Sequence, residues 1–136
     1  MKIVSFAIRE NGRNPKMIEI LPESLNNLLV TKATGKLTTE DYEKIWIPAL
    51  EAILKNNKKI RVACWLPPGF EGWEAGAIWD DAKFGIKHRN DMEKMAIIGG
   101  PEWVVWATKL GAHFIEGTIK TFENKDFQAA VEWAKT

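Results

Sequence analysis

The spacing of apolar and polar positions changes along the chain, from short strand-like runs near the start to helical periods further on. Residues 17–21 and 28–33 are two apolar runs separated by the turn-forming segment 22–26. So short a connection predicts an antiparallel hairpin. From residue 38 onward, strand-like and helical stretches alternate, which is typical of βα units that build a mostly parallel sheet with helices packed on it.

Four helices are expected along this pattern. The first opens with a capping-box sequence at Thr38–Asp41 and contains Pro48, which should kink it because proline removes one backbone hydrogen bond. The second covers residues 74–88, the third begins near Pro101, and Asn124 is expected to cap the last. Strands are expected at residues 60–66, 94–98 and 114–122. The fold class is therefore α/β: an antiparallel entry hairpin, then a mixed and mostly parallel sheet with about four helices.

The helix at 74–88 carries two apolar stripes. We expect the first stripe to face the core, and its members are Ala75, Ile78, Trp79, Ala82 and Ile86. This helix and the next one, which begins near Pro101, carry more apolar surface than one face of a sheet can bury. A cavity, a second subunit or a membrane is needed to cover the remainder. The residues expected to line such a ligand-binding site come from the second stripe, the loop before it and the next helix: Phe70, Trp73, Ala77, Phe84, Trp103 and Trp106.

Composition narrows the function classes. The chain has 136 residues, which suits one domain, and its net charge of +1 gives no field that would attract nucleic acid. A single cysteine, Cys64, excludes an intrachain disulfide and fits a reducing compartment. No apolar run reaches the roughly 18 residues of a membrane span, so we expect a cytoplasmic protein. Residues 1–16 are assigned to an N-terminal extension and residues 17–136 to the domain. For the extension we favour an edge or partner strand over a dimer-swapped arm or a poorly ordered segment.

Few residues suggest catalysis. Between Glu40 and Ala107 there is no Ser or Thr, so a hydroxyl of either type cannot act at the loop around residue 70. Asp80 and Asp81 are adjacent on a helix and point about 100° apart, which excludes a shared-proton pair. No spacing of His, Cys and carboxylates suggests a metal site. We therefore expect no catalytic residue, metal or cofactor; an enzyme using Asp80, Asp81, Lys83 or His88 is the alternative.

Several runs resemble one known family. The opening of SpoIIAA-like proteins is similar to three runs here: residues 33–38, Asp41-Tyr42 and residues 48–50. The match continues at Gly72-Trp73 and at residues 79–85 (WDDAKFG). The resemblance extends through Lys87-His88, residues 96–99, Trp103 and Trp106. It therefore covers the chain from about residue 17 to the end. The resemblance implies a STAS-like fold, also similar to CRAL-TRIO lipid carriers, with ligand binding and membrane association. STAS-type antagonists of anti-sigma factors carry a phosphorylatable Ser where this chain has residues 72–76 (GWEAG), so the switch is not carried over.

The sequence thus predicts a non-enzymatic STAS/SpoIIAA-like module that binds an apolar small molecule or lipid. We expect the module to contact a membrane peripherally and to form a homodimer. We do not expect it to bind nucleic acid. The alternative is a homodimeric protein-interaction or regulatory module that uses the same apolar surface.

Overall fold

The computed structural model describes residues 17–113 and 115–136. The expectation that residues 1–16 form an edge or partner strand lies outside the described residues. The same holds for Phe114, the first residue of the last expected strand.

The main sheet has five strands in the order β1-β2-β4-β6-β7. β1 (Ile18–Ile20) runs antiparallel to β2 (Leu28–Ala33), which confirms the entry hairpin. β4 (Ile60–Leu66), β6 (Met92–Gly99) and β7 (Thr118–Phe122) then follow in parallel. The α/β fold with a mixed, mostly parallel sheet is confirmed.

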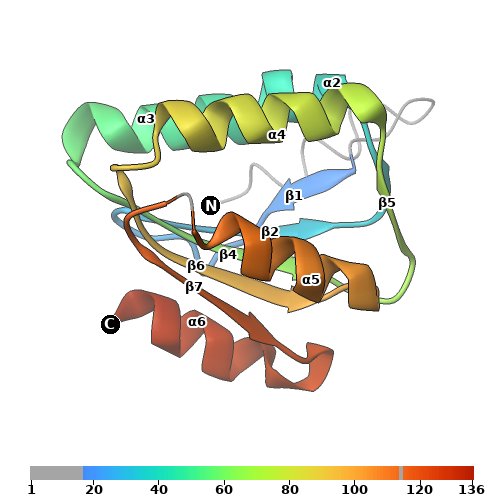
Figure 1. Cartoon of the computed structure of the whole chain (residues 1–136). Coiled ribbons are helices and arrows are strands. Elements are labelled where there is room, and N and C mark those ends of the chain that lie inside the picture. The colour runs from blue at the N-terminus through green and yellow to red at the C-terminus, as the bar shows by residue number, and fades with distance from the viewer. Residues whose placement is uncertain (1–16, 114) are drawn as a thin grey trace.

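The helices form two unequal layers (Figure 1). α2 (Thr39–Asp41), the π-helix η1 (Tyr42–Trp46) and α3 (Ile47–Asn56) make one continuous helical segment. Together with α4 (Ala75–Lys87) this segment covers one face of the sheet. α5 (Glu102–Gly111) contributes Val104 to the same core and lies near β7. The 3-10 turn η2 (Asn124–Asp126) leads into α6 (Phe127–Lys135), which covers the opposite face.

A second, two-stranded sheet stands beside the main one. β3 (Gly35–Leu37) pairs in parallel with β5 (Phe70–Trp73), so residues expected to form an open loop are extended backbone in a ladder. The pairing places the end of β5, and with it the start of α4, next to the start of α2. It therefore fixes the position of both aromatic side chains of β5.

Two features of the first helix follow directly from its sequence. Thr38 and Asp41 form a reciprocal capping box, as expected: the Thr38 hydroxyl accepts the Asp41 amide N–H at 3.1 Å, and Asp41 Oδ2 accepts the Thr38 amide N–H at 2.9 Å. Pro48 has no N–H for an α-helical bond to residue 44. The chain accommodates this loss with a π-helical turn, in which the Ile47 N–H donates to the Tyr42 carbonyl.

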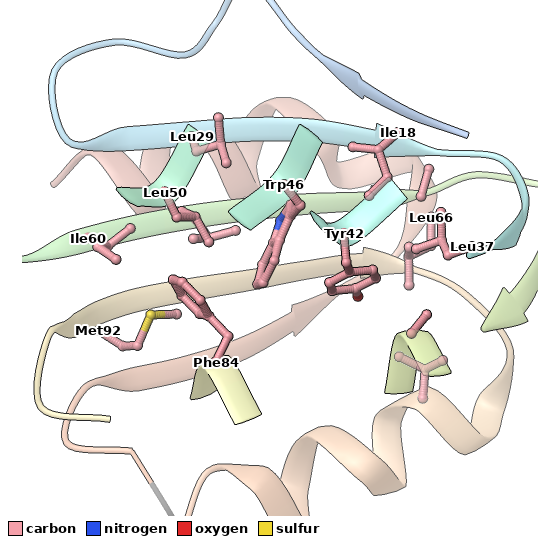
Figure 2. Close-up of a cluster of buried hydrophobic side chains, with 14 residues drawn as sticks. Ile18, Leu29, Leu37, Tyr42, Trp46, Leu50, Ile60, Leu66, Phe84 and Met92 are labelled. Atoms are coloured by element: carbon pink, nitrogen blue, oxygen red, sulfur yellow. The ribbon is translucent and has the colours of Figure 1, made fainter. Parts of the chain in front are cut away.

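The larger core lies between the sheet and the helical segment. Figure 2 shows Tyr42, Trp46 and Leu50 projecting from that segment, with Phe84 reaching toward Trp46 from α4. The Trp46 and Phe84 rings meet edge to face with centroids 5.4 Å apart, a geometry that aromatic quadrupoles favour. These contacts hold α4 against η1.

The expected orientation of α4 is wrong. Its buried residues are Ala77, Asp80 and Phe84, whereas Ile78, Trp79 and Ile86 are more than half exposed. At Gly76 an added Cβ would meet the Thr39 side chain, so α4 lies against α2 through small residues. The face with Ala77 and Phe84 packs on the core, and the face with Ile78, Trp79 and Ile86 is left to solvent.

Asn124 also differs from expectation. Its side chain caps no helix; its Oδ1 accepts the Trp65 indole N–H at 2.8 Å, and Glu123 occupies the N-cap position of η2. The bond ties the end of β7 to the surface of β4.

We expect the two faces of α4 to respond oppositely to truncation. Phe84→Ala should lower the free energy of unfolding by about 3–5 kcal/mol, because it leaves a cavity beside Trp46. Trp79→Ala, on the exposed face, should change it by no more than about 0.5 kcal/mol. Chemical denaturation of both variants measures this, and a larger loss for Trp79→Ala would contradict the observed orientation.

Candidate functional site

A row of aromatic rings connects β5 with α5. Phe70 and Trp73 of β5 meet edge to face at 4.9 Å, and Trp73 meets Trp103 of α5 in the same way at 5.3 Å. Phe70 and Trp73 are half-buried and Trp103 is half exposed. The rings therefore lie at the boundary between core and solvent, where they can contact both.

α5 extends this row along its own exposed side. Trp103, Trp106 and Leu110 recur at helical spacing and are 50%, 69% and 66% exposed, whereas Val104 points into the core. The Lys109 ammonium lies 5.6 Å from the centre of the Trp106 ring. We call Phe70, Trp73, Trp103 and Trp106 the aromatic surface, and Trp103, Trp106 and Leu110 the α5 stripe.

The other two expected site residues lie elsewhere. Ala77 is fully buried, and Phe84 is buried between the Trp46 ring and the His88 ring. The structure thus brings Phe70, Trp73 and Trp103 into contact and places Trp106 on the same face of α5. Ala77 and Phe84 belong to the core that supports them.

The orientation of Trp73 is fixed by a polar contact that the sequence analysis missed. Its indole N–H donates to the Tyr42 hydroxyl at 2.8 Å. Burial raises the pKa of Tyr42 well above its ordinary value, and the Asp81 carboxylate adds to the increase. Tyr42 therefore stays a neutral phenol that accepts from Trp73 and keeps its own proton to donate.

Asp81 of α4 is the charged group that acts on that hydroxyl. Its side chain reaches solvent, yet the surrounding protein removes enough water that desolvation raises its pKa from 3.8 to about 6, while hydrogen bonding from Tyr42 lowers it. Among the described residues, no Lys, Arg or His forms an ion pair with Asp81. At neutral pH Asp81 is therefore an exposed carboxylate that pairs with no cationic side chain of the described residues.

The sheet face beneath α4 and α5 is covered unevenly. Ile60 and Val62 are fully buried there, whereas Cys64, Met95 and Ile97 belong to the same core but remain partly accessible. Desolvation raises the pKa of the Cys64 thiol to about 11, and its Sγ lies 3.5 Å from the Thr31 hydroxyl. Cys64 is thus a neutral thiol at physiological pH, poorly suited to act as a nucleophile.

The groups named for an enzyme are held in separate contacts. Asp80 is buried with one oxygen 3.8 Å from the Lys83 ammonium, and its other oxygen has no partner among the described residues. His88 caps α4 and its Nδ1 lies 2.9 Å from Asp91 Oδ2. Within the part of the chain that the structure describes, no three His, Cys, Asp or Glu side chains are grouped to hold a metal. No helix there has the length and apolar character needed to cross a bilayer.

The comparisons with known proteins agree with this fold. The model of the SpoIIAA-like family matches residues 28–135, so the chain belongs to the SpoIIAA-like family. Among solved structures, it is similar to an uncharacterised protein with a SpoIIAA-like fold from Shewanella loihica PV-4. The two are 37% identical with a TM-score of 0.69, over 89% of this chain and 96% of that one. No curated protein matches the sequence.

The raised pKa of Asp81 predicts a specific pH dependence of stability. The folded protein binds the Asp81 proton more tightly than the unfolded chain, so the contribution of this group is greatest below pH 3.8 and is lost as pH rises through about 6. Asp81→Asn should remove this loss. The free energy of unfolding of the variant, relative to that of the native protein, should therefore be higher at pH 7 than at pH 4. Urea unfolding of both proteins across this range measures the difference.

Glu51→Gln, on the exposed surface of α3, controls for the removal of one negative charge. A difference between Asp81→Asn and the native protein that is flat with pH, or that is reproduced by Glu51→Gln, would contradict the assignment.

Proposed function

We propose that this protein is a non-enzymatic SpoIIAA-like module that binds an apolar or lipid-like ligand at the aromatic surface, with reversible membrane association. The observation that carries the proposal is the α5 stripe, whose three large side chains are half exposed or more and continue directly into the Trp73 and Phe70 rings. Soluble domains seldom leave such contiguous apolar surface uncovered unless it binds something.

The energetics suit a reversible interaction. Each side chain of the α5 stripe is already partly covered. Burying the exposed part of one such side chain therefore contributes on the order of 1–2 kcal/mol. The three together supply about 3–6 kcal/mol, which is comparable with a single lipid anchor that associates only transiently with a membrane. Lys109, beside Trp106, adds a positive charge that favours anionic lipid.

The chemistry around the site also supports binding over catalysis. The chain offers no Ser or Thr from Glu40 to Ala107, and its one cysteine has a raised pKa. The Trp73 ring is held by its hydrogen bond to Tyr42 and by its contacts with Phe70 and Trp103, which lowers the entropy cost of binding an apolar molecule against it.

A homodimeric interaction module is the second candidate, and the outward face of α4 favours it. Ile78, Trp79 and Ile86 form a second exposed stripe along that helix, here called the α4 stripe. Two copies could bury this stripe against each other or against the α5 stripe, because helices with one apolar face associate readily.

Flotation with vesicles of phosphatidylcholine and phosphatidylglycerol tests the first candidate. We expect the native protein to float with the vesicles and Trp106→Glu to remain in solution, because the charge sits at the centre of the α5 stripe. Trp106 is largely exposed, so this variant should fold normally; its circular dichroism spectrum and unfolding midpoint check this.

Trp79→Glu is the matched control, since it places the same charge at an equally exposed Trp on α4. It should float like the native protein. Flotation of Trp106→Glu equal to that of the native protein would exclude the α5 stripe as the contact. Dimers of the native protein that Trp79→Glu or Trp106→Glu converts to monomers, in the absence of flotation, would establish the second candidate instead.

A further inference from the structure

The outward face of α4 combines large apolar side chains with a centre of small residues. Ile78, Trp79 and Ile86 of the α4 stripe are 52%, 64% and 59% exposed. Ala82 lies between them along the helix, and Gly85 adjoins it. A Cβ added at Gly85 would meet no atom of the described residues within 4 Å. The α4 stripe therefore has room at its centre for a bulky side chain from a partner.

Opposite charges lie on the two flanks of this stripe. Because successive residues of an α-helix are rotated by about 100°, Asp81 lies to one side of Ala82 and Lys83 to the other. Glu74, at the start of α4, falls on the Asp81 side, and Lys87 falls on the Lys83 side. All four charged side chains are exposed. One flank of the α4 stripe is therefore acidic and the other is basic.

This distribution of charge decides how a second copy can pack against α4. In a parallel pair of α4 helices related by a two-fold axis along their length, the acidic flank of each copy meets the basic flank of the other. Asp81 then faces the partner's Lys83, and symmetry repeats this contact once. In an antiparallel pair each flank meets its own equivalent, so carboxylates face carboxylates in every register and oppose association. The parallel pair is the one with complementary charges.

The apolar side chains fit the same parallel arrangement. At equal heights along the helices, Trp79 of one copy lies opposite the partner's Ile78. Ile86 lies opposite the partner's Gly85, where the absence of a side chain leaves space for it. Glycine inside a helix is destabilising by itself, and receiving Ile86 from a second copy gives Gly85 a purpose. Large residues thus meet small ones across the two-fold axis, as an isologous interface requires.

We propose that the α4 stripe is the interface of a homodimer in which two copies of α4 pack in parallel, with Asp81 of each copy beside the partner's Lys83. This inference selects one arrangement for the second candidate function, α4 against α4, and it does not depend on a ligand at the aromatic surface. The helix pair has 13 residues from each copy. Such an interface is small, so we expect a reversible dimer in the micromolar range.

Sedimentation equilibrium of charge variants tests the contact between Asp81 and Lys83. We expect Asp81→Lys to dimerise about tenfold more weakly than the native protein, because two symmetric contacts become repulsive. Lys83→Glu should have the same effect. An equimolar mixture of the two variants should form heterodimers as tightly as the native homodimer, because both contacts are complementary again. Glu51→Lys, the same charge reversal on the exposed surface of α3, should dimerise like the native protein.

The folding of each variant is checked by its unfolding midpoint. Lys83 also lies 3.8 Å from the buried carboxylate of Asp80, so Lys83→Glu is the variant most prone to unfold. Asp81→Lys alters an exposed side chain, and it decides the outcome together with the cross-link below if Lys83→Glu does not fold.

Ala75→Cys tests the orientation of the two helices. Ala75 is exposed and lies seven residues before Ala82 on the same side of α4. A parallel pair brings the two introduced thiols together, so mild oxidation should give a disulfide-linked dimer. In an antiparallel pair centred at Ala82 they would be about 21 Å apart along the helix axes. The native protein, whose one cysteine is Cys64 of the core, should stay unlinked.

Each contrary result overturns a distinct statement. A native protein that stays monomeric overturns the homodimer and leaves the proposed ligand site, which flotation measures, standing. A dimer that neither Trp79→Glu nor Asp81→Lys weakens excludes α4 as the interface. A dimer that Trp79→Glu disrupts, but that Asp81→Lys leaves intact and Ala75→Cys does not link, overturns the parallel arrangement.

Discussion

The hydrogen bond from the Trp73 indole to the Tyr42 hydroxyl joins β5, the strand that leads into α4, to the helical segment that contains η1. The position of the site depends on this contact. Tyr42 stands in a π-helical turn that follows from Pro48, and Trp73 ends the short strand that leads into α4. Because Tyr42 is buried, its hydroxyl holds the Trp73 indole in one orientation at the edge of the core. The position of the aromatic surface thus depends on one buried polar contact.

Much of the fold could be predicted because its elements have strong local signals. The entry hairpin follows from two apolar runs with a short turn, and the start of the first helix follows from the capping box at Thr38. The β3–β5 pair could not be predicted in this way. Its strands have three and four residues, include glycines, and pair across more than thirty residues of sequence, so no local periodicity reveals them.

The orientation of α4 shows a limit of apolar periodicity. Two stripes have helical spacing, and spacing alone predicts that the one with Ile78 and Trp79 faces the core. The structure buries the other stripe: Ala77 and Phe84 lie in the core, and small residues at the start of α4 meet Thr39 of α2. Spacing cannot decide between two such stripes, because the choice depends on which helix packs beside them. Tyr42 was missed for a related reason, since an aromatic residue just after a helix cap is indistinguishable from an ordinary core residue until its partner is known.

The position of the exposed aromatic rings limits what the proposed site can select. Apolar area supplies affinity for any ligand with a hydrocarbon chain, but it discriminates poorly between chains of similar size. Phe70 and Trp73 are held at the edge of the core by their ring contact and by the Tyr42 hydroxyl, whereas Trp106 extends into solvent. A partner that buries all of these rings must therefore cover both the end of β5 and the exposed side of α5. The extent of that surface, more than any one polar group, would then decide which partners fit it.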